Sequence, residues 1–128
     1  MSSSNTVPGP LPGSESVAFC MRLRAGCEAE YRRRHDALWP DMRAALVNAG
    51  ILHYEIHLEP ESLLLFAFMV RRADHTTDAL PGQEVWQRWQ AHMSDILMQE
   101  DKLPLLVPLQ PMFLLQSEAL GRYQAISG

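Results

Sequence analysis

The chain has 128 residues and a formal net charge of −4, and both numbers limit what the protein is. This length fits one domain, which buries roughly two-thirds of the surface of its unfolded chain. No basic cluster lies outside residues 32–34, which argues against nucleic acid as a partner, because phosphate binding needs many clustered cations. No segment reaches the roughly 18 to 20 consecutive apolar residues of a membrane-spanning helix, and no export signal is found. We therefore expect a cytoplasmic protein without membrane attachment.

The N-terminal segment, residues 1–16, is rich in serine, proline and glycine and is predicted to be a disordered tail. In residues 17–24, apolar side chains alternate with the period of two of a half-buried strand, which Ala25-Gly26 ends. The domain is expected to span residues 17–116, followed by a C-terminal tail at 117–128. The two cysteines are expected to be reduced, because the chain carries no export signal.

Residues 27–38 are predicted to form a helix that carries aromatic rings four residues apart. A four-residue step keeps side chains on one face of a helix, so Tyr31 and His35 project together. Trp39 is the next ring, and Pro40 ends or bends the helix behind it. A phenol, an imidazole and an indole around one pocket suit proton transfer to a small hydroxylated ligand. An amphipathic helix with structural aromatic residues explains the same spacing.

The same helix carries arginines at residues 32–34. They are predicted to form a solvated face, on which Glu30 pairs with Arg34 one turn away. Such a pair contributes only a few tenths of a kcal/mol, about 0.2 to 0.5.

The remaining elements complete a known topology. We expect a helix at 40–48, strands at 51–58 and 63–70, a helix at 83–98, a loop over 99–108 and a strand at 109–116. With the first strand and helix, the order is β-α-β-β-α-β. This is the ferredoxin-like α+β fold, an antiparallel four-stranded sheet with helices on one face. A second copy would cover the apolar side chains of the other face, so we expect a homodimer of the dimeric α+β barrel type.

His35 is the strongest single candidate for chemistry, because imidazole gives and takes protons near neutral pH. The helix at 83–98 adds three residues that could wall a pocket, Trp86, Trp89 and His92, at steps of three residues. Indole faces stack well against the C–H face of a sugar ring. Ordinary core packing explains the same spacing equally well.

The strand at 51–58 presents a possible set of metal ligands. His53, Glu55 and His57 lie on one face at two-residue spacing and offer nitrogen and oxygen atoms together. A solvated strand face explains this alternation better, so we expect no metal. The sequence also has no glycine-rich phosphate loop, no nucleophile elbow and no carboxylate pair placed for glycosidic cleavage, so we expect no cofactor.

The sequence resembles the L-rhamnose mutarotase family. The family pattern Tyr-x-x-x-His-x-x-x-Trp-Pro is matched at residues 31–40, its tyrosine on the second strand at Tyr54, and its Arg/Lys-Trp segment at residues 88–89. The resemblance covers residues 17 to 116. It implies a cofactor-free dimeric enzyme that interconverts the α and β anomers of a 6-deoxyhexose. Carried over, His35 is the proton donor, and the sugar-binding side chains are Tyr31, Tyr54, Trp89 and, in place of a second tryptophan, Gln90.

Two departures from the family concern the sugar. Gln90 stands where the family has the second indole of a Trp-Trp pair, and residues 98–104 replace the usual Asn-Pro-Asp-Asn-Ser-Pro loop. An amide in place of an indole could favour a differently placed hydroxyl. L-Rhamnose is the expected substrate and L-fucose the alternative. A sugar-binding sensor without catalysis, or a cofactor-free oxygenase, would have the same fold. The candidate site also includes three pocket-wall residues, Trp39, Trp86 and His92.

Overall fold

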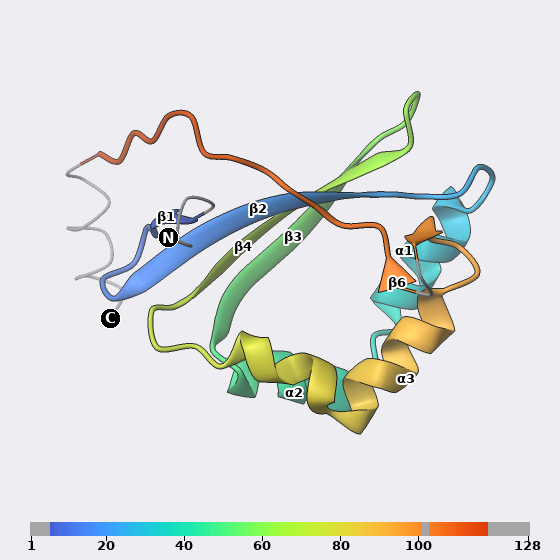
Figure 1. The fold of residues 1–128 in the computed structure, drawn as a ribbon, viewed down its shortest axis with the longest axis horizontal. Helices are drawn as coiled ribbons and strands as arrows, with labels where there is room; N and C mark the ends of the chain where they lie inside the picture. The colour runs from blue at the N-terminus through green and yellow to red at the C-terminus, as the bar shows by residue number, and fades with distance from the viewer. Residues whose placement is uncertain (1–5, 101–102, 118–128) are drawn as a thin grey trace.

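We describe the fold from a computed structural model, which covers residues 6–100 and 103–117. The elements follow in the order β1 (Thr6–Pro8), β2 (Ser14–Arg22), α1 (Glu28–Asp36), α2 (Pro40–Asn48), β3 (Ile51–Glu59), β4 (Leu64–Arg72), the 3-10 helix η2 (Thr77–Gly82), α3 (Glu84–Met93), β5 (Gln99–Glu100), β6 (Leu103–Pro104) and β7 (Val107–Pro108). Figure 1 shows α2 and α3 together on one side of the long strands β2, β3 and β4. The helix α2 matches its prediction residue for residue, and the other helices and long strands lie close to theirs, except that α3 ends at Met93 rather than at residue 98.

The sheet has the strand order of the predicted fold. β2 pairs with β4, and β4 with β3, while β1 and β7 both pair with the remaining edge of β2. All of these pairings are antiparallel. The four strands β7-β2-β4-β3 therefore place the first and third strands of the β-α-β-β-α-β order at the centre. The predicted ferredoxin-like α+β fold is confirmed.

Residues 6–16 differ from the disordered tail that the composition predicted. Thr6–Pro8 pairs with Glu15, Ser16 and Val17 of β2, so this segment is a hairpin. Its turn uses Gly13 at φ 72°, and the Ser14 hydroxyl donates to the Leu11 carbonyl at 2.6 Å. Glycine and serine thus serve here as turn residues. Residues 1–5 and 118–128 lie outside the described residues.

The last strand is shorter and earlier than predicted. Only Val107–Pro108 pairs with β2, and the backbone N–H of Leu109 donates to the Ala18 carbonyl at 3.0 Å. No strand is present over residues 109–117, where the apolar run predicted one. Proline has no N–H, so Pro108 and Pro111 remove two of the donors that a continued ladder would need.

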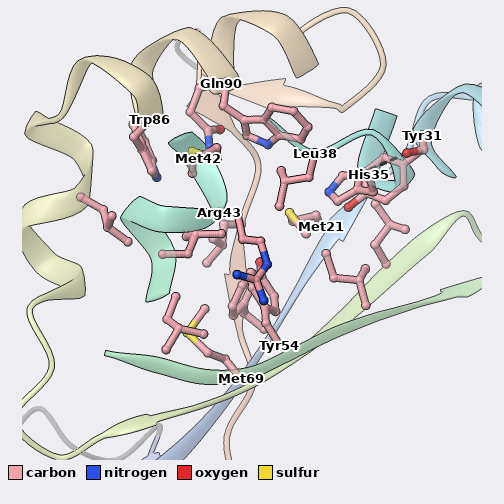
Figure 2. A pocket seen from close by; sticks show the side chains of 18 of the residues that line it. Met21, Tyr31, His35, Leu38, Met42, Arg43, Tyr54, Met69, Trp86 and Gln90 are labelled. Carbon is pink, nitrogen blue, oxygen red and sulfur yellow. Dashed lines mark hydrogen bonds between the residues drawn. The ribbon is translucent and has the colours of Figure 1, made fainter. Parts of the chain in front are cut away.

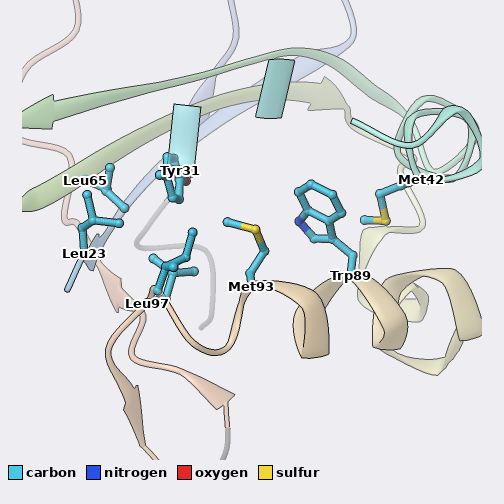
Figure 3. Close-up of a cluster of buried hydrophobic side chains, with 8 residues drawn as sticks. Leu23, Tyr31, Met42, Leu65, Trp89, Met93 and Leu97 are labelled. Carbon is cyan, nitrogen blue, oxygen red and sulfur yellow. The ribbon is translucent and has the colours of Figure 1, made fainter. Parts of the chain in front are cut away.

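The main core lies between the sheet and α3 and includes two residues of the candidate site. Its buried members are Leu23, Tyr31, Met42, Leu65, Trp89, Met93, Ile96 and Leu97 (Figure 3). A second cluster under α2 consists of Ala45, Ala49, Ile51 and Leu80. Tyr31 and Trp89 are therefore held by tight packing. None of the helices in the described ranges is long and apolar enough to cross a membrane.

Candidate active site

A cavity of about 1390 Å³ opens between the sheet and the helices, with walls from β2, α1, α2, β3, β4 and α3. A smaller recess of about 80 Å³ shares several of these walls. The residues predicted for proton transfer and sugar binding all line both spaces: Tyr31, His35, Tyr54, Trp89 and Gln90. Residues from three separate elements, α1, β3 and α3, thus meet at one place, as Figure 2 shows for four of them.

His35 faces the cavity with one ring nitrogen already engaged. Its Nδ1 lies 3.1 Å from the carbonyl oxygen of Tyr31, one turn earlier in α1. A carbonyl can only accept, so Nδ1 carries the hydrogen, and in the neutral ring Nε2 is left as a proton acceptor. Burial lowers the pKa of His35, an effect opposed in part by the Tyr31 carbonyl and by Asp36. The imidazole is therefore neutral at neutral pH, with Nε2 as a base.

Two phenols accompany this imidazole. The ring of Tyr31 stacks on that of His35, with 4.2 Å between centroids and 28° between planes. Tyr54 on β3 is 37% exposed overall, yet burial raises its pKa to about 12. Burial also raises the pKa of Tyr31. Both hydroxyls therefore stay protonated at neutral pH and can donate hydrogen bonds to a ligand.

Trp89 joins α3 to this arrangement. It is buried, and its ring meets His35 edge-on, at 5.5 Å and 88°. Behind it, Trp39 lies at 5.1 Å and His92 at 5.4 Å between ring centroids. Trp86 lines the cavity as expected, whereas Trp39 and His92 do not. The expectation that all three are pocket walls therefore needs correction: Trp39 and His92 pack behind Trp89 and hold it in place.

Five other side chains of the cavity wall did not stand out in the sequence as site residues: Met21, Leu38, Met42, Arg43 and Met69 (Figure 2). Alternation in β2 and helical spacing in α2 did place Met21 and Met42 on inward faces, but only as core residues. Nothing in the sequence marked Arg43 as a site residue, because an arginine next to an inward-facing methionine is expected to be solvated. In the view of Figure 2, its side chain extends from α2 toward Tyr54.

The polar side chains of β3 contact one another at the border of the cavity, whose lining includes His53 and His57 but not Glu55. Glu55 contacts His53 Nε2 at 2.5 Å and His57 Nε2 at 2.8 Å, so these three side chains satisfy one another. Hydrogen bonding to both histidines lowers the pKa of Glu55. Within residues 6–100 and 103–117, no group of three or more histidine, cysteine, aspartate or glutamate side chains is arranged to hold a metal ion.

The predicted solvated face of α1 is only partly solvated. Arg33 is 67% exposed and pairs with Glu30, as a surface residue does. Arg34 is only 12% exposed and contacts Asp95, far along the chain, in addition to Glu30. The sequence predicted the local pair and missed the distant one. Hydrogen bonds from both arginines lower the pKa of Glu30 to about 2.

A ferredoxin-like sheet, covered on one face by helices that enclose an imidazole, two phenols and an indole, defines the class of a small-molecule-binding α+β protein. Comparison with known proteins makes this assignment specific. The family model for L-rhamnose mutarotase matches residues 16–115. L-Rhamnose mutarotases of Jannaschia sp. (strain CCS1) and Verminephrobacter eiseniae (strain EF01-2) are 50% and 48% identical over 77% and 78% of this chain. These matches cover 96% and 95% of the two relatives. The chain belongs to the L-rhamnose mutarotase family, a family of carbohydrate isomerases.

Solved structures agree with this assignment. The crystal structure of the L-rhamnose mutarotase FA22100 from Formosa agariphila superposes with a TM-score of 0.71 at 32% identity, covering 79% of this chain and 98% of that one. Rv0793 from Mycobacterium tuberculosis, with a TM-score of 0.52 and 18% identity, shares the fold alone. The family predicted from residues 17 to 116 is confirmed.

Proposed function

We propose that this protein interconverts the α and β anomers of L-rhamnose, with His35 as the acid-base residue. One observation carries the proposal: a neutral imidazole with a free Nε2 lines a recess together with two protonated phenols, an indole and an amide. Anomer exchange requires a group that both takes and returns a proton, and a neutral histidine does so without a cofactor.

Nε2 of His35 takes the proton of the anomeric hydroxyl, and the bond between C1 and the ring oxygen breaks, with its electron pair moving to the ring oxygen. That oxygen takes a proton from a phenol or a water, which leaves an open-chain aldehyde. After rotation about the C1–C2 bond, the same steps run in reverse on the other face of the carbonyl, and the imidazolium returns its proton. His35 thus acts as the proton donor expected from the family in the second half of the cycle. A positioned acid or base of this kind contributes about 10² to 10⁴ in rate.

The other recess residues are proposed to hold the sugar. The Trp89 indole offers an apolar surface, and Tyr31 and Tyr54 offer hydroxyl donors. Gln90 offers an amide, with donors and an acceptor, at the position where the family pattern has its second tryptophan. L-Fucose therefore stays the alternative substrate, since it is a 6-deoxyhexose with its hydroxyls placed differently.

The test is NMR exchange spectroscopy on the anomeric protons of L-rhamnose and, separately, of L-fucose. We expect the wild-type protein to accelerate exchange and the His35→Ala variant to lose most of that acceleration. His75→Ala is the matched control, because His75 does not line the cavity and contacts Glu15 instead, with 3.3 Å from Nε2 to Oε2. The sugar with the larger acceleration is the substrate. Sugar binding with unchanged exchange would overturn the proposal in favour of a sensor, and oxygen consumption in favour of an oxygenase.

We also infer that the protein acts as a homodimer. The sheet face away from the helices exposes Phe66 and Phe68, at 39% and 38%, beside Val107 at 48%. A second copy would cover these side chains. A cytoplasmic location, expected from the sequence, stays a prediction.

A further inference from the structure

Arg34 connects α1 to the end of α3. Its Nη1 donates to the His92 carbonyl at 2.6 Å and to Asp95 Oδ1 at 2.8 Å, and its Nη2 lies 3.3 Å from Asp95 Oδ2. Its Nε donates to Glu30 at 2.6 Å. The Arg34 side chain is 12% exposed, whereas its partner Asp95 is 67% exposed. A planar guanidinium used on three sides in this way is held in one orientation.

Apart from Arg34, α1 is held by a few apolar contacts: the buried Tyr31 ring, the His35 ring against Trp89, and partly buried Cys27 and Leu38 beyond its two ends. Tyr31 is the one buried residue of this nine-residue helix, and its N-cap, Cys27, makes no side-chain capping bond. These contacts lie on one side of the helix and, within the described residues, include no hydrogen bond from an α1 side chain to another element. The Arg34 bonds supply that link, because they join α1 to the end of α3.

The attachment point is well suited to a cation. α3 ends at Met93, so the His92 carbonyl is one of the last in the helix, where carbonyl oxygens lack partners within the helix. A positive charge is favourable at a helix C-terminus. Asp95 lies two residues beyond Met93, and its carboxylate balances the charge of Arg34.

These bonds also set the distance between the two helices that form the site. His35 is adjacent to Arg34 on α1, and Trp89 lies one turn before His92 on α3. The contact between the His35 and Trp89 rings, at 5.5 Å, spans the same two helices. A roll of α1 would move His35 Nε2 relative to Trp89 and to the recess.

We propose that Arg34 is a positioning residue for His35: by binding Asp95 and the His92 carbonyl, it holds α1 on the end of α3 so that Nε2 points into the sugar recess. This inference rests on the proposed acid-base role of His35. Arg34 does not line the cavity itself, so its effect on the reaction passes through His35.

Arg33 provides the matched control. It is the neighbouring residue on the same helix and binds the same carboxylate, Glu30, with 2.9 Å from Nε to Oε1. It is 67% exposed, and its ion pair stays within α1. Replacing Arg33 therefore removes an equal charge from the same helix without breaking the link to α3.

The experiment compares Arg34→Gln, Asp95→Asn and Arg33→Gln by anomer exchange at several sugar concentrations. We expect Arg34→Gln to lower kcat about 10- to 100-fold, the range expected when a reacting group is misplaced by about 1 Å, with a smaller change in KM. Asp95→Asn should act in the same direction more weakly, because the His92 carbonyl and Glu30 remain bound. Arg33→Gln should match the wild type.

A second readout follows the imidazole itself. The titratable groups around His35 are Tyr31 and Asp36 on α1, Tyr54 on β3 and, behind Trp89, His92 on α3. None of them is changed in these variants. If α1 rolls, His35 gains water, and its NMR titration and the acid limb of the rate profile should both move to higher pH in Arg34→Gln.

The outcomes separate this inference from the proposed function. Loss of exchange in His35→Ala, together with wild-type kcat and titration in Arg34→Gln, would overturn the positioning role and leave the mutarotase intact. No acceleration by the wild type would overturn both. If circular dichroism shows that Arg34→Gln does not fold, the positioning role is tested with Asp95→Asn instead. Asp95 is 67% exposed, and its replacement leaves no buried group unpaired.

Discussion

The bond from His35 Nδ1 to a backbone carbonyl determines which protonation state this residue brings to the reaction. The ring is neutral at rest, and burial holds its pKa below the ordinary value of 6.5. A lowered pKa means that the base form survives to lower pH and is lost only as the pH falls through that lowered value.

The expected rate profile follows directly. Anomer exchange by the protein should stay flat from pH 8 down through 6.5, the ordinary histidine value, and should fall only at lower pH, as the pH passes the lowered pKa of His35. Exchange spectroscopy between pH 4.5 and 8, with the spontaneous rate subtracted at each pH, measures this. His35→Ala supplies the baseline. A rate that rises as the pH falls would instead identify the protonated imidazole as the resting form, acting first as an acid.

Gln90 should affect binding more than turnover. It lines the recess but forms no part of the proton relay, so Gln90→Leu should raise the KM for the sugar about 5- to 10-fold, the value of one hydrogen bond at about 1 kcal/mol, with kcat little changed. Gln87→Leu is the control, because Gln87 is an exposed residue of α3 that donates to the Pro81 carbonyl at 3.0 Å. A fall in kcat with unchanged KM would show that Gln90 acts on the transition state.

The residues of the site differed in how far the sequence could predict them. The spacing of Tyr31 and His35 is set within one helix, so periodicity was sufficient to place them together. Tyr54 and Gln90 were reached through the family resemblance, since no local rule brings a strand residue to a helix residue. Arg34 was missed, because its main partner, Asp95, lies 61 positions away and local spacing reports only Glu30.

Among the secondary-structure elements, the turn from α2 into β3 depends on one glycine. Gly50 has φ 104°, and a Cβ added there would lie 3.1 Å from both Cα and Cβ of His75. Few residues other than glycine tolerate this backbone conformation. The Gly50 carbonyl in this turn also accepts a hydrogen bond from the backbone N–H of Arg72 at 2.8 Å.

Gly50→Ala should therefore lower the free energy of unfolding by about 1 to 3 kcal/mol, through backbone strain and the clash with His75. Urea unfolding followed by tryptophan fluorescence measures the change. Gly82→Ala is the matched control, because a Cβ there meets nothing within 4 Å. Equal midpoints for the two variants would mean that the loop carrying His75 moves away at no cost.

Element ends were harder to predict than element types. Apolar spacing continues past Met93, which extended the predicted helix to residue 98, but α3 ends at Met93. Beyond it, Ile96 and Leu97 stay buried in a turn, and Leu97 forms a bridge with Leu23. Tertiary packing thus buries these apolar residues although they lie outside the helix. The N-terminal hairpin was missed for the opposite reason, since its turn residues resemble those of a disordered segment.

The molecule as a whole has two different sheet faces. Leu65 and Met69 of β4 line the cavity under the helices, so Phe66 and Phe68, between them, lie on the other face. Their directly paired neighbours on that face are Cys20 and His57 for Phe66, and Ala18 and Glu55 for Phe68. An apolar strip with a rim of histidine and glutamate has the composition of an interface with a polar edge.

Replacing both phenylalanines by glutamate should therefore separate the proposed dimer. We expect the wild type to have a molar mass of two 14.5 kDa chains by light scattering, and Phe66→Glu/Phe68→Glu that of one. The new carboxylates would have to be buried in the interface beside Glu55, a cost of several kcal/mol per charge. Val47→Glu is the control, because Val47 is 49% exposed on the helix side. A wild-type monomer, or a double variant that keeps the wild-type mass, would mean that this face does not join two copies of the chain.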